Sequence, residues 1–324
     1  MSLALSGDPR VAAATRERLV LLAREHRYTP NAAARSLRRG RTGTVGIVLW
    51  EEVLREHHGR LQAQLVTAVE TIIAREHQAL VIPASRARLA REPIDRIVEQ
   101  APTDGAFFLG PTHDFEGVAR LVRAGYPLVH CGKRTIPGDR RVVVPYVSVD
   151  FRAGCRLGVE HLVQRGHRRI AVLVDSQTLL EQANQRVMGY RDALADAGVP
   201  AEPGWVVQHQ PGSPESADVV QRLRRLGVTA VFATRVHLAL DLLRLCSSAG
   251  VRVPEELAVA SFDDCDEAAL ANPPLTAVRQ PTEEIAARAA SLLMRFIDGG
   301  AVPAAERQQV LPVDLVVRQS SGGR

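Results

Sequence analysis

Residues 105–131 have the sequence GAFFLGPTHDFEGVARLVRAGYPLVHC, in which two short apolar runs flank an amphipathic stretch. The runs at 105–109 and 128–131 predict buried strands, and the stretch 115–124 predicts the helix between them. A strand, a helix and a second strand in this order are typical of a unit that adds two parallel strands to one sheet. The segment therefore predicts an α/β fold.

The same rhythm extends in both directions along the chain. Further strands are predicted at 44–50, 80–83, 142–149, 169–174, 205–208, 230–233, 257–262 and 314–317. Further helices are predicted at 60–76, 93–100, 152–164, 182–197, 215–226, 237–249 and 283–298. Two open runs of this kind, each near the usual domain size, predict two lobes. We expect lobe 1 to comprise about 44–150 plus 281–299 and lobe 2 about 151–278 plus 303–324, with the backbone crossing between them more than once.

Composition places the chain among globular proteins and gives no sign of a bound metal or cofactor. It has 324 residues, of which 46% are hydrophobic and 24% charged. No apolar run approaches the ~20 residues that span a bilayer, and a signal-peptide pattern is missing, so a cytoplasmic location is expected. The cysteines, Cys131, Cys155, Cys246 and Cys265, form no CxxC pair, and the histidines lack metal-site spacing. We predict neither a metal site nor a cofactor.

The positive charge is concentrated at the amino terminus. Residues 1–45 carry nine arginines and three acidic residues, a net charge of +6, whereas the rest of the chain has a net charge of −1. A basic segment on a near-neutral body is expected when one small module binds a polyanion, with nucleic acid as the first candidate. Residues 8–26 predict a helix that begins at Asp8-Pro9 and ends before Tyr28-Thr29-Pro30, and 31–37 predict a shorter helix that begins at the capping residue Asn31.

Short motifs along the whole chain resemble, in order, those of the LacI/GalR family of bacterial transcription regulators. They are Ala4-Leu5-Ser6-Gly7, Val11, Thr15-Arg16, Tyr28-Thr29-Pro30-Asn31, Ala34-Arg35-Ser36-Leu37, Val147-Ser148-Val149-Asp150, the run GVEHLVQRGHRRI at 158–170, Arg186-Val187-Met188-Gly189-Tyr190, the stretch 250–262 followed by Asp263-Asp264, and Pro273-Pro274-Leu275-Thr276. The resemblance implies a two-lobed periplasmic-binding-protein-like core of parallel sheets flanked by helices. It also implies a small α-helical DNA-binding segment, with a partial helix-turn-helix headpiece at 1–30 and a hinge helix and linker at 31–43, before the effector-binding and dimerisation core at 44–324.

The resemblance also implies where DNA is bound. It assigns contacts to Ser2 in the headpiece and to the hinge residues Asn31, Ala34, Arg35, Ser36, Leu37, Arg38 and Arg39. A short helix with Leu37 beside arginines can insert an apolar wedge between base steps while the guanidinium groups hold phosphates. Read in isolation, this tetrapeptide would be an ordinary linker in a solvated basic run. Its place between a headpiece-like helix and the first strand favours the hinge.

The start of the chain departs from the family pattern. Family headpieces have one helix and a turn before the recognition helix, whereas residues 1–5 resemble only the end of that second helix. We therefore expect that the native protein begins upstream of Met1, and that a chain beginning there binds DNA weakly and with little specificity, because it lacks most of the helix that reads the major groove.

The effector is expected between the lobes, at the carboxyl ends of the strands. By that rule Trp50, Leu109-Gly110, Asp175, Arg235 and Asp263 are candidates, and Arg186 and Asp263 also match family effector contacts. Arg186 can donate several hydrogen bonds to ligand oxygens, and Asp263 can accept them from hydroxyl groups. Each has the alternative of a plain salt bridge. Arg235-Val236 replaces the usual Asn-Asp pair, and this gain of positive charge favours an anionic, sugar-like ligand.

We therefore predict a homodimeric transcriptional regulator, most simply a repressor, which binds pseudo-palindromic double-stranded operator DNA. A sugar or anionic sugar-like effector between the lobes would control that binding. One alternative is a stand-alone two-lobed small-molecule-binding protein without DNA binding, against which the hinge-like segment and the missing export signal argue. The other is an enzyme, but GxSxG, GxxxxGK[ST] and GxGxxG motifs are all missing.

Overall fold

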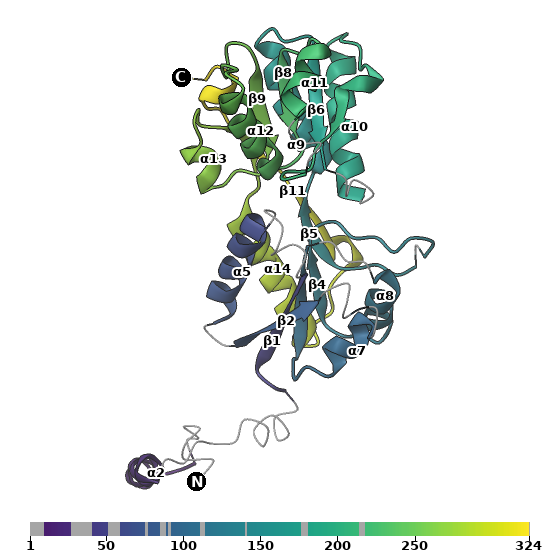
Figure 1. The fold of residues 1–324 in the computed structure, drawn as a ribbon. Coiled ribbons are helices and arrows are strands. Elements are labelled where there is room, and N and C mark those ends of the chain that lie inside the picture. The colour runs from purple at the N-terminus through teal and green to yellow at the C-terminus, as the bar shows by residue number, and fades with distance from the viewer. Residues whose placement is uncertain are drawn as a thin grey trace.

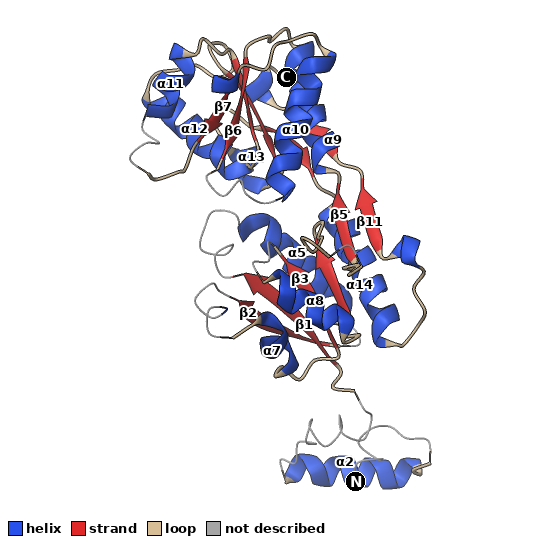
Figure 2. Ribbon diagram, turned by 90° about the vertical axis from the view of Figure 1, so that its right-hand side faces the viewer, coloured by secondary structure: helices blue, strands red, loops and turns tan. Residues whose placement is uncertain are grey.

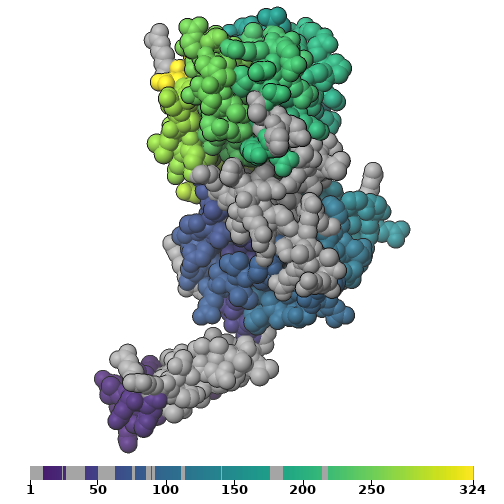
Figure 3. Space-filling view, viewed as in Figure 1, coloured from purple at the N-terminus to yellow at the C-terminus, as the bar shows by residue number. Residues whose placement is uncertain are grey.

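The computed structural model describes residues 10–26, 41–50, 59–74, 77–84, 89, 92–110, 114–139, 141–175, 181–213 and 218–323. Two lobes follow one another along the long axis of the molecule, and helix α2 (Ala13–Glu25) lies outside both (Figure 1). In the space-filling view the green second lobe lies above the blue first lobe, and the purple helix α2 lies below both (Figure 3). Among the helices that the structure describes, none has the length and apolar composition to cross a membrane.

The first lobe is built on a six-stranded sheet in which every pair of neighbouring strands is parallel. Its order is β11-β5-β4-β3-β1-β2. The strands are β1 (Thr44–Trp50), β2 (Gln78–Ala84), β3 (Gly105–Leu109), β4 (Leu128–Cys131), β5 (Tyr146–Val149) and β11 (Gln308–Leu311). The helices are α5 (Gly59–Ile73), α7 (Ile94–Glu99), α8 (Phe115–Arg123) and α14 (Thr282–Ile297).

Helices cover both faces of this sheet, which is why its central strand is apolar throughout. On β3, Phe107 packs in a core with residues of α5 and α14, while Phe108 packs with residues of α7 and α8 on the other face. Both side chains are fully buried, and each such burial contributes about 1.5–3 kcal/mol. The unbroken apolar run GAFFL is therefore the sequence of a strand that is buried on two sides.

The second lobe repeats this plan with one antiparallel edge strand. Its order is β12-β10-β9-β8-β6-β7, and β12 is antiparallel to β10. The strands are β6 (Ile170–Val174), β7 (Val206–Gln208), β8 (Ala230–Ala233), β9 (Ala258–Phe262), β10 (Thr276–Arg279) and β12 (Asp314–Val316). The helices are α9 (Phe151–Gln164), α10 (Glu181–Asp196), α11 (Val219–Arg225), α12 (Val236–Ser248) and α13 (Asp266–Leu270), and short 3₁₀ turns occupy Pro203–Trp205, Ala304–Glu306 and Gln319–Ser321.

Glycine sets the distance between α9 and this second sheet. A Cβ atom on Gly158 would lie 2.2 Å from the ring of Phe232 on β8, which is closer than atoms can approach. Gly158 is the first residue of the GVEHLVQRGHRRI motif, and this close packing explains why the motif begins with glycine.

The chain passes between the lobes three times, which confirms the expectation of more than one crossing. The passages join β5 to α9, β10 to α14, and β11 to β12. Figure 2 shows β5 and β11 side by side where the lobes meet. Because β5 ends at the second lobe and β10 ends at the first, the carboxyl edges of the two sheets face one another.

Most predicted elements are present with small changes of boundary, but some were missed or misplaced. The helix predicted to begin at Asp8-Pro9 begins at Ala13, and residues 10–12 are not helical. The strand predicted at 142–149 is limited to β5, and strands β10 and β11 and helix α13 were not predicted. The assignment of all of 303–324 to the second lobe is wrong for Gln308–Leu311, which pairs with β5 in the first sheet. This strand is short and largely exposed, so it lacks the apolar run that marks the others. The helix predicted at 31–37 lies outside the described residues.

Candidate ligand-binding site

Charged and polar side chains gather at the carboxyl edge of the second sheet, where it faces the first lobe. Asp175 follows β6, Arg235 follows β8, Asp263 follows β9 and Gln280 follows β10, while Arg186 reaches them from α10. The structure therefore brings together four predicted effector residues, Asp175, Arg186, Arg235 and Asp263. We call these five side chains the charged cluster.

Arg186 is the buried centre of the charged cluster. Its side chain is 3% exposed, and its guanidinium carbon lies 4.6 Å from the ring centroids of both Phe151 and Phe262. Its Nη2 lies 3.9 Å from Oδ2 of Asp263, and its Nε has no hydrogen-bond partner among the described residues. Burial lowers the pKa of Arg186 to about 10, and Asp263 opposes that shift, so the side chain remains a cation at neutral pH.

The Arg-x-x-Gly-Tyr pattern at 186–190 has a local explanation. A Cβ atom on Gly189 would lie 2.1 Å from the carbonyl oxygen of Arg152, so only glycine lets α10 lie this close to α9. The buried hydroxyl of Tyr190 donates a hydrogen bond of 2.8 Å to the carbonyl of Ile170 at the start of β6. These contacts fix α10 within one turn of Arg186 and so fix where its guanidinium lies.

Asp263 and Asp264 are adjacent in sequence but have separate environments. Asp263 has φ of 73°, and its Oδ1 accepts a hydrogen bond of 2.5 Å from Nε2 of Gln280. Asp264 pairs with Arg318, at 2.7 Å from its Nη1. The two carboxylates therefore have different partners and do not act as a pair. The left-handed backbone at Asp263 is uncommon for a residue with a side chain and is typical of functional positions.

The structure pairs Arg235 with Asp175. Nε of Arg235 lies 2.9 Å from Oδ2 of Asp175, and their side chains are 17% and 8% exposed. The sequence interpretation counted Arg235 as an added positive charge, whereas here an adjacent carboxylate balances it. The charged cluster therefore holds two arginines and two aspartates, so Arg235 by itself no longer favours an anionic ligand over a neutral, hydroxylated one.

Sequence reasoning missed Gln280 and the stacking role of Phe151 and Phe262. Gln280 directly follows β10, a strand that was not predicted. Had that strand been recognised, Gln280 would have been a candidate, because ligands of such folds bind at the carboxyl ends of the strands. Phe151 is the first residue of α9, and its sequence context gave no signal of this role.

The other predicted site residues are not brought into the charged cluster by described contacts. Trp50 ends β1 in the first lobe, at the edge that faces the second, but its side chain is outside the described part of the structure. The predicted DNA contacts also lie outside the described residues; they are Ser2, Asn31, Ala34, Arg35, Ser36, Leu37, Arg38 and Arg39.

Arg41 follows the predicted hinge residues in the sequence and binds the chain to the first lobe. Its Nη1 lies 2.7 Å from Oδ1 of Asp298, and its Nη2 donates to the carbonyl of Ile297, also at 2.7 Å. Both partners are at the carboxyl end of α14, where a cation is stabilised by the helix dipole. The helix begins just after the passage from β10, so it spans the distance between that passage and Arg41.

Comparison with known proteins places this geometry among transcription regulators. Residues 159–321 match the model of a periplasmic binding protein-like domain. The transcriptional regulator CelR of Thermobifida fusca is 31% identical over 99% of this chain and 93% of its own, and catabolite control protein A of Priestia megaterium is 26% identical over 99% and 94%.

Solved structures of regulators have the same fold. A complex of the transcriptional regulator CelR with cellobiose matches with a TM-score of 0.75 and 31% identity, over 98% of this chain and 94% of that one. A lac repressor dimer bound to operator and an anti-inducer matches with a TM-score of 0.80 and 22% identity, over 99% and 94%.

Proposed function

Because the chain belongs to the LacI/GalR family of transcription regulators, we propose that it is a DNA-binding repressor whose operator binding is set by a small molecule held at the charged cluster. The observation that carries the ligand site is the burial of Arg186 between two phenylalanine rings, 3.9 Å from Asp263, at the edge that faces the other lobe. A buried cation and anion with unused hydrogen-bonding capacity are suited to a polar ligand.

The ligand class that best fits the charged cluster is a sugar. Opposite charges are balanced, and donors from Arg186 and Gln280 lie beside acceptors from Asp263 and Asp175. Hydroxyl groups donate and accept, so they can use both kinds of group, whereas a strong anion would meet two carboxylates. The cellobiose complex of CelR supports the same class. An anionic sugar is the second candidate, supported by the two arginines.

The proposed mechanism uses the three passages between the lobes. A ligand that contacts both carboxyl edges favours one relative arrangement of the lobes, because it gains its full set of contacts only there. Arg41 is bound to Asp298 and Ile297 at the carboxyl end of α14. A movement of the first lobe would therefore also move the segment that precedes Arg41. The hinge helices of two copies would then pack together on DNA or separate.

We also propose a cytoplasmic homodimer without catalytic activity. Apolar side chains are exposed at Ile72 on α5, at Val81 on β2 and at Leu270 on α13, which is 83% exposed. Figure 1 shows α5 and α13 on one side of the molecule, where a second copy would cover them. A two-fold dimer matches two half-sites of a pseudo-palindromic operator.

The test measures DNA binding and ligand binding on the same protein. Fluorescence anisotropy with duplexes from the region upstream of its own gene should show specific binding by a chain with a complete helix-turn-helix, and a sugar that raises its melting temperature should change that affinity at least tenfold. Ligand binding without any specific DNA binding would instead support the stand-alone binding protein. Turnover of the sugar would support an enzyme.

A further inference from the structure

Arginine side chains gather at the amino edge of the second sheet, which points away from the first lobe. The segments 165–169, 197–205, 222–229 and 249–257 precede β6, β7, β8 and β9, and they hold seven arginines and three glutamates, a net charge of +4. Two of the arginines, Arg224 and Arg252, pair with Glu256. We call the other five the basic pole; they are Arg165, Arg168, Arg169, Arg222 and Arg225.

The two parts of the basic pole adjoin, because β6 and β8 are neighbours in the sheet. The backbone N–H of Thr229, before β8, donates to the carbonyl of Arg169, before β6, at 2.8 Å. Nη1 of Arg169 lies 3.5 Å from the place where a Cβ atom on Gly227 would be, and Gly227 comes two residues after Arg225. The loop at 165–169 and the end of α11 therefore form one continuous surface.

Carboxylates leave the charge of the basic pole unbalanced. All five side chains are exposed, and none forms an ion pair with any residue that the structure describes. Arg165 and Arg168 donate to the backbone carbonyls of Gly322 and Val163, at 2.7 and 2.9 Å, which orients the side chains without neutralising them.

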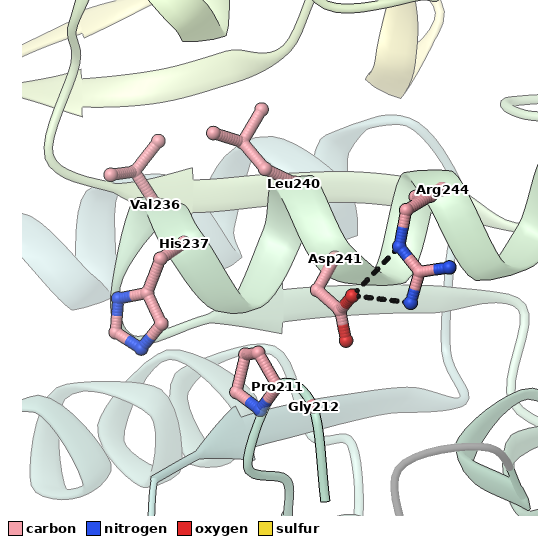
Figure 4. Close-up of a pocket in the computed structure, with 7 residues that line it drawn as sticks. All are labelled: Pro211, Gly212, Val236, His237, Leu240, Asp241 and Arg244. Carbon is pink, nitrogen blue, oxygen red and sulfur yellow. Dashed lines mark hydrogen bonds and ion pairs between the residues drawn. The ribbon is translucent and has the colours of Figure 1, made fainter. Parts of the chain in front are cut away.

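Exposed arginines elsewhere in the core are mostly paired. Arg244, which lines the pocket beside α12, donates from Nε and Nη2 to the carboxylate of Asp241 (Figure 4). Similar pairs are formed by Arg96, Arg120, Arg123, Arg152, Arg156, Arg279, Arg288 and Arg295. Residues 46–324 together have a net charge of −1, so a segment group of +4 leaves −5 on the rest of the core. A polyanion is therefore attracted to this edge in preference to other faces of the core.

The surface around the basic pole is polar. The exposed large hydrophobic side chains of the described residues all lie outside the four segments. Protein interfaces have an apolar centre, and surfaces that bind membranes insert apolar side chains, whereas protein–DNA interfaces are polar and strongly positive. The planar fork of arginine also matches the oxygens of a phosphate group. We propose that the basic pole binds the phosphate backbone of double-stranded DNA through charge, without reading bases.

This contact is separate from the DNA binding proposed for the amino-terminal segment. Figure 1 shows α11 at the far end of the second lobe, whereas α2 lies beyond the first lobe. One duplex bound at the amino-terminal segment would leave the basic pole accessible, so a chain with both contacts would hold two segments of DNA. The contact at the basic pole does not depend on the effector or on the hinge.

Hydrogen exchange followed by mass spectrometry tests the proposal on the purified full chain, because it locates the contact. The probe is a short mixed-sequence duplex. Saturating duplex should slow amide exchange at 164–169 and 225–229 about threefold or more and leave 285–297 in the first lobe unchanged. Protection confined to residues before Arg41, or no protection, would overturn the proposal. Protection of the basic pole by polyglutamate but not by duplex would assign it to an acidic protein and would also overturn it.

Two matched double variants test the role of the arginines. Arg222→Ala with Arg225→Ala removes two positive charges from the basic pole, and Arg141→Ala with Arg191→Ala removes two exposed arginines that lie outside it and have no carboxylate partner among the described residues. Affinity is read from protection at 164–169 at several salt concentrations. The slope of log K against log salt should become less steep by about 1.8 in the first variant, because two phosphate contacts are lost, and should stay unchanged in the second. Equal slopes in the two variants would overturn the assignment, and unaltered exchange in the first lobe shows that both are folded.

Discussion

Arg186 and Asp263 are buried side by side, yet the 3.9 Å between Nη2 and Oδ2 is too long for a hydrogen bond. A buried guanidinium gives up its hydration, and the two phenylalanine rings return only part of that free energy through cation–π contact. A ligand oxygen beside this pair can supply the missing hydrogen bonds. The loose contact is therefore the strongest structural sign that the charged cluster is a binding site.

Replacing Arg186 should abolish effector binding while the chain remains folded. Arg186→Met removes the donors, so affinity for a sugar that raises the melting temperature of the unaltered chain should fall at least 100-fold. Arg186→Lys keeps the charge but loses the planar fork, and it should cost about tenfold or more. Titration calorimetry measures both. Arg191→Ala, an exposed change on the same helix, should have no effect, and retained affinity in Arg186→Met would place the ligand elsewhere.

The ion pair between Arg235 and Asp175 should set the preference between neutral and anionic ligands. Asp175→Asn removes the balancing carboxylate, so binding of glucose 6-phosphate relative to glucose should improve by about tenfold. Arg235→Gln should shift the same ratio the other way. Competition titrations with the two sugars measure the ratio. If Asp218→Asn, on the exposed start of α11, altered the ratio as much, the effect would come from net charge alone.

Acid should destabilise the folded chain through His130. Burial, with a contribution from the positive charge of Arg134, lowers the pKa of His130 well below 6.5. Between the folded and unfolded pKa values the unfolded chain binds the extra proton, so stability present at neutral pH is lost as pH falls below about 6.5, by up to about 1.4 kcal/mol per pH unit.

His130→Leu should therefore flatten the dependence of unfolding free energy on pH. Urea unfolding at intervals between pH 7.5 and 5 measures the slope, and Val310→Ala, an exposed change on β11 that alters no titratable group, should keep the original slope. The slope is compared instead of the stability at one pH, because the substitution also removes the 2.9 Å contact between Nδ1 and the carbonyl of Gly132. An unchanged slope would assign the acid sensitivity to other groups.

Leu37→Ala should weaken operator binding and leave effector binding intact. The sequence places Leu37 as an apolar wedge in the hinge, and loss of its side chain removes the contacts that compensate for unstacking a base step. In a chain with a complete helix-turn-helix, anisotropy should show at least a tenfold loss of specific affinity, while calorimetry shows the same sugar affinity. Unchanged operator affinity would mean that Leu37 is an ordinary linker residue.

The sequence predicted the parts of the fold that are marked by local patterns. Runs such as GAFFL are apolar throughout because helices cover both faces of their strand, so they stand out without any tertiary information. Gln308–Leu311 has no such run because it lies at an edge and is mostly exposed, and its place beside β5 became visible only in the structure.

In the candidate site, too, some features were predicted from the sequence and others were visible only in the structure. Arg186 and Asp263 were identified from short motifs, and Gly189 and Tyr190 explain why the motif around Arg186 has its spacing. The partnership of Arg235 with Asp175 was beyond the sequence, because these residues lie 60 positions apart and meet only where β8 and β6 are neighbours. The sequence alone presented Arg235 as an added positive charge that would attract anions. The structure shows that the carboxylate of Asp175 balances this charge.

By itself, then, the sequence determined a two-lobed α/β protein of a regulator family, since periodicity, strand-end residues and ordered motifs are local properties of the chain. Only the tertiary structure decided the order of the strands and the balance of charge at their carboxyl edge. Those features depend on which strands become neighbours, and packing of helices against both faces of each sheet sets that arrangement.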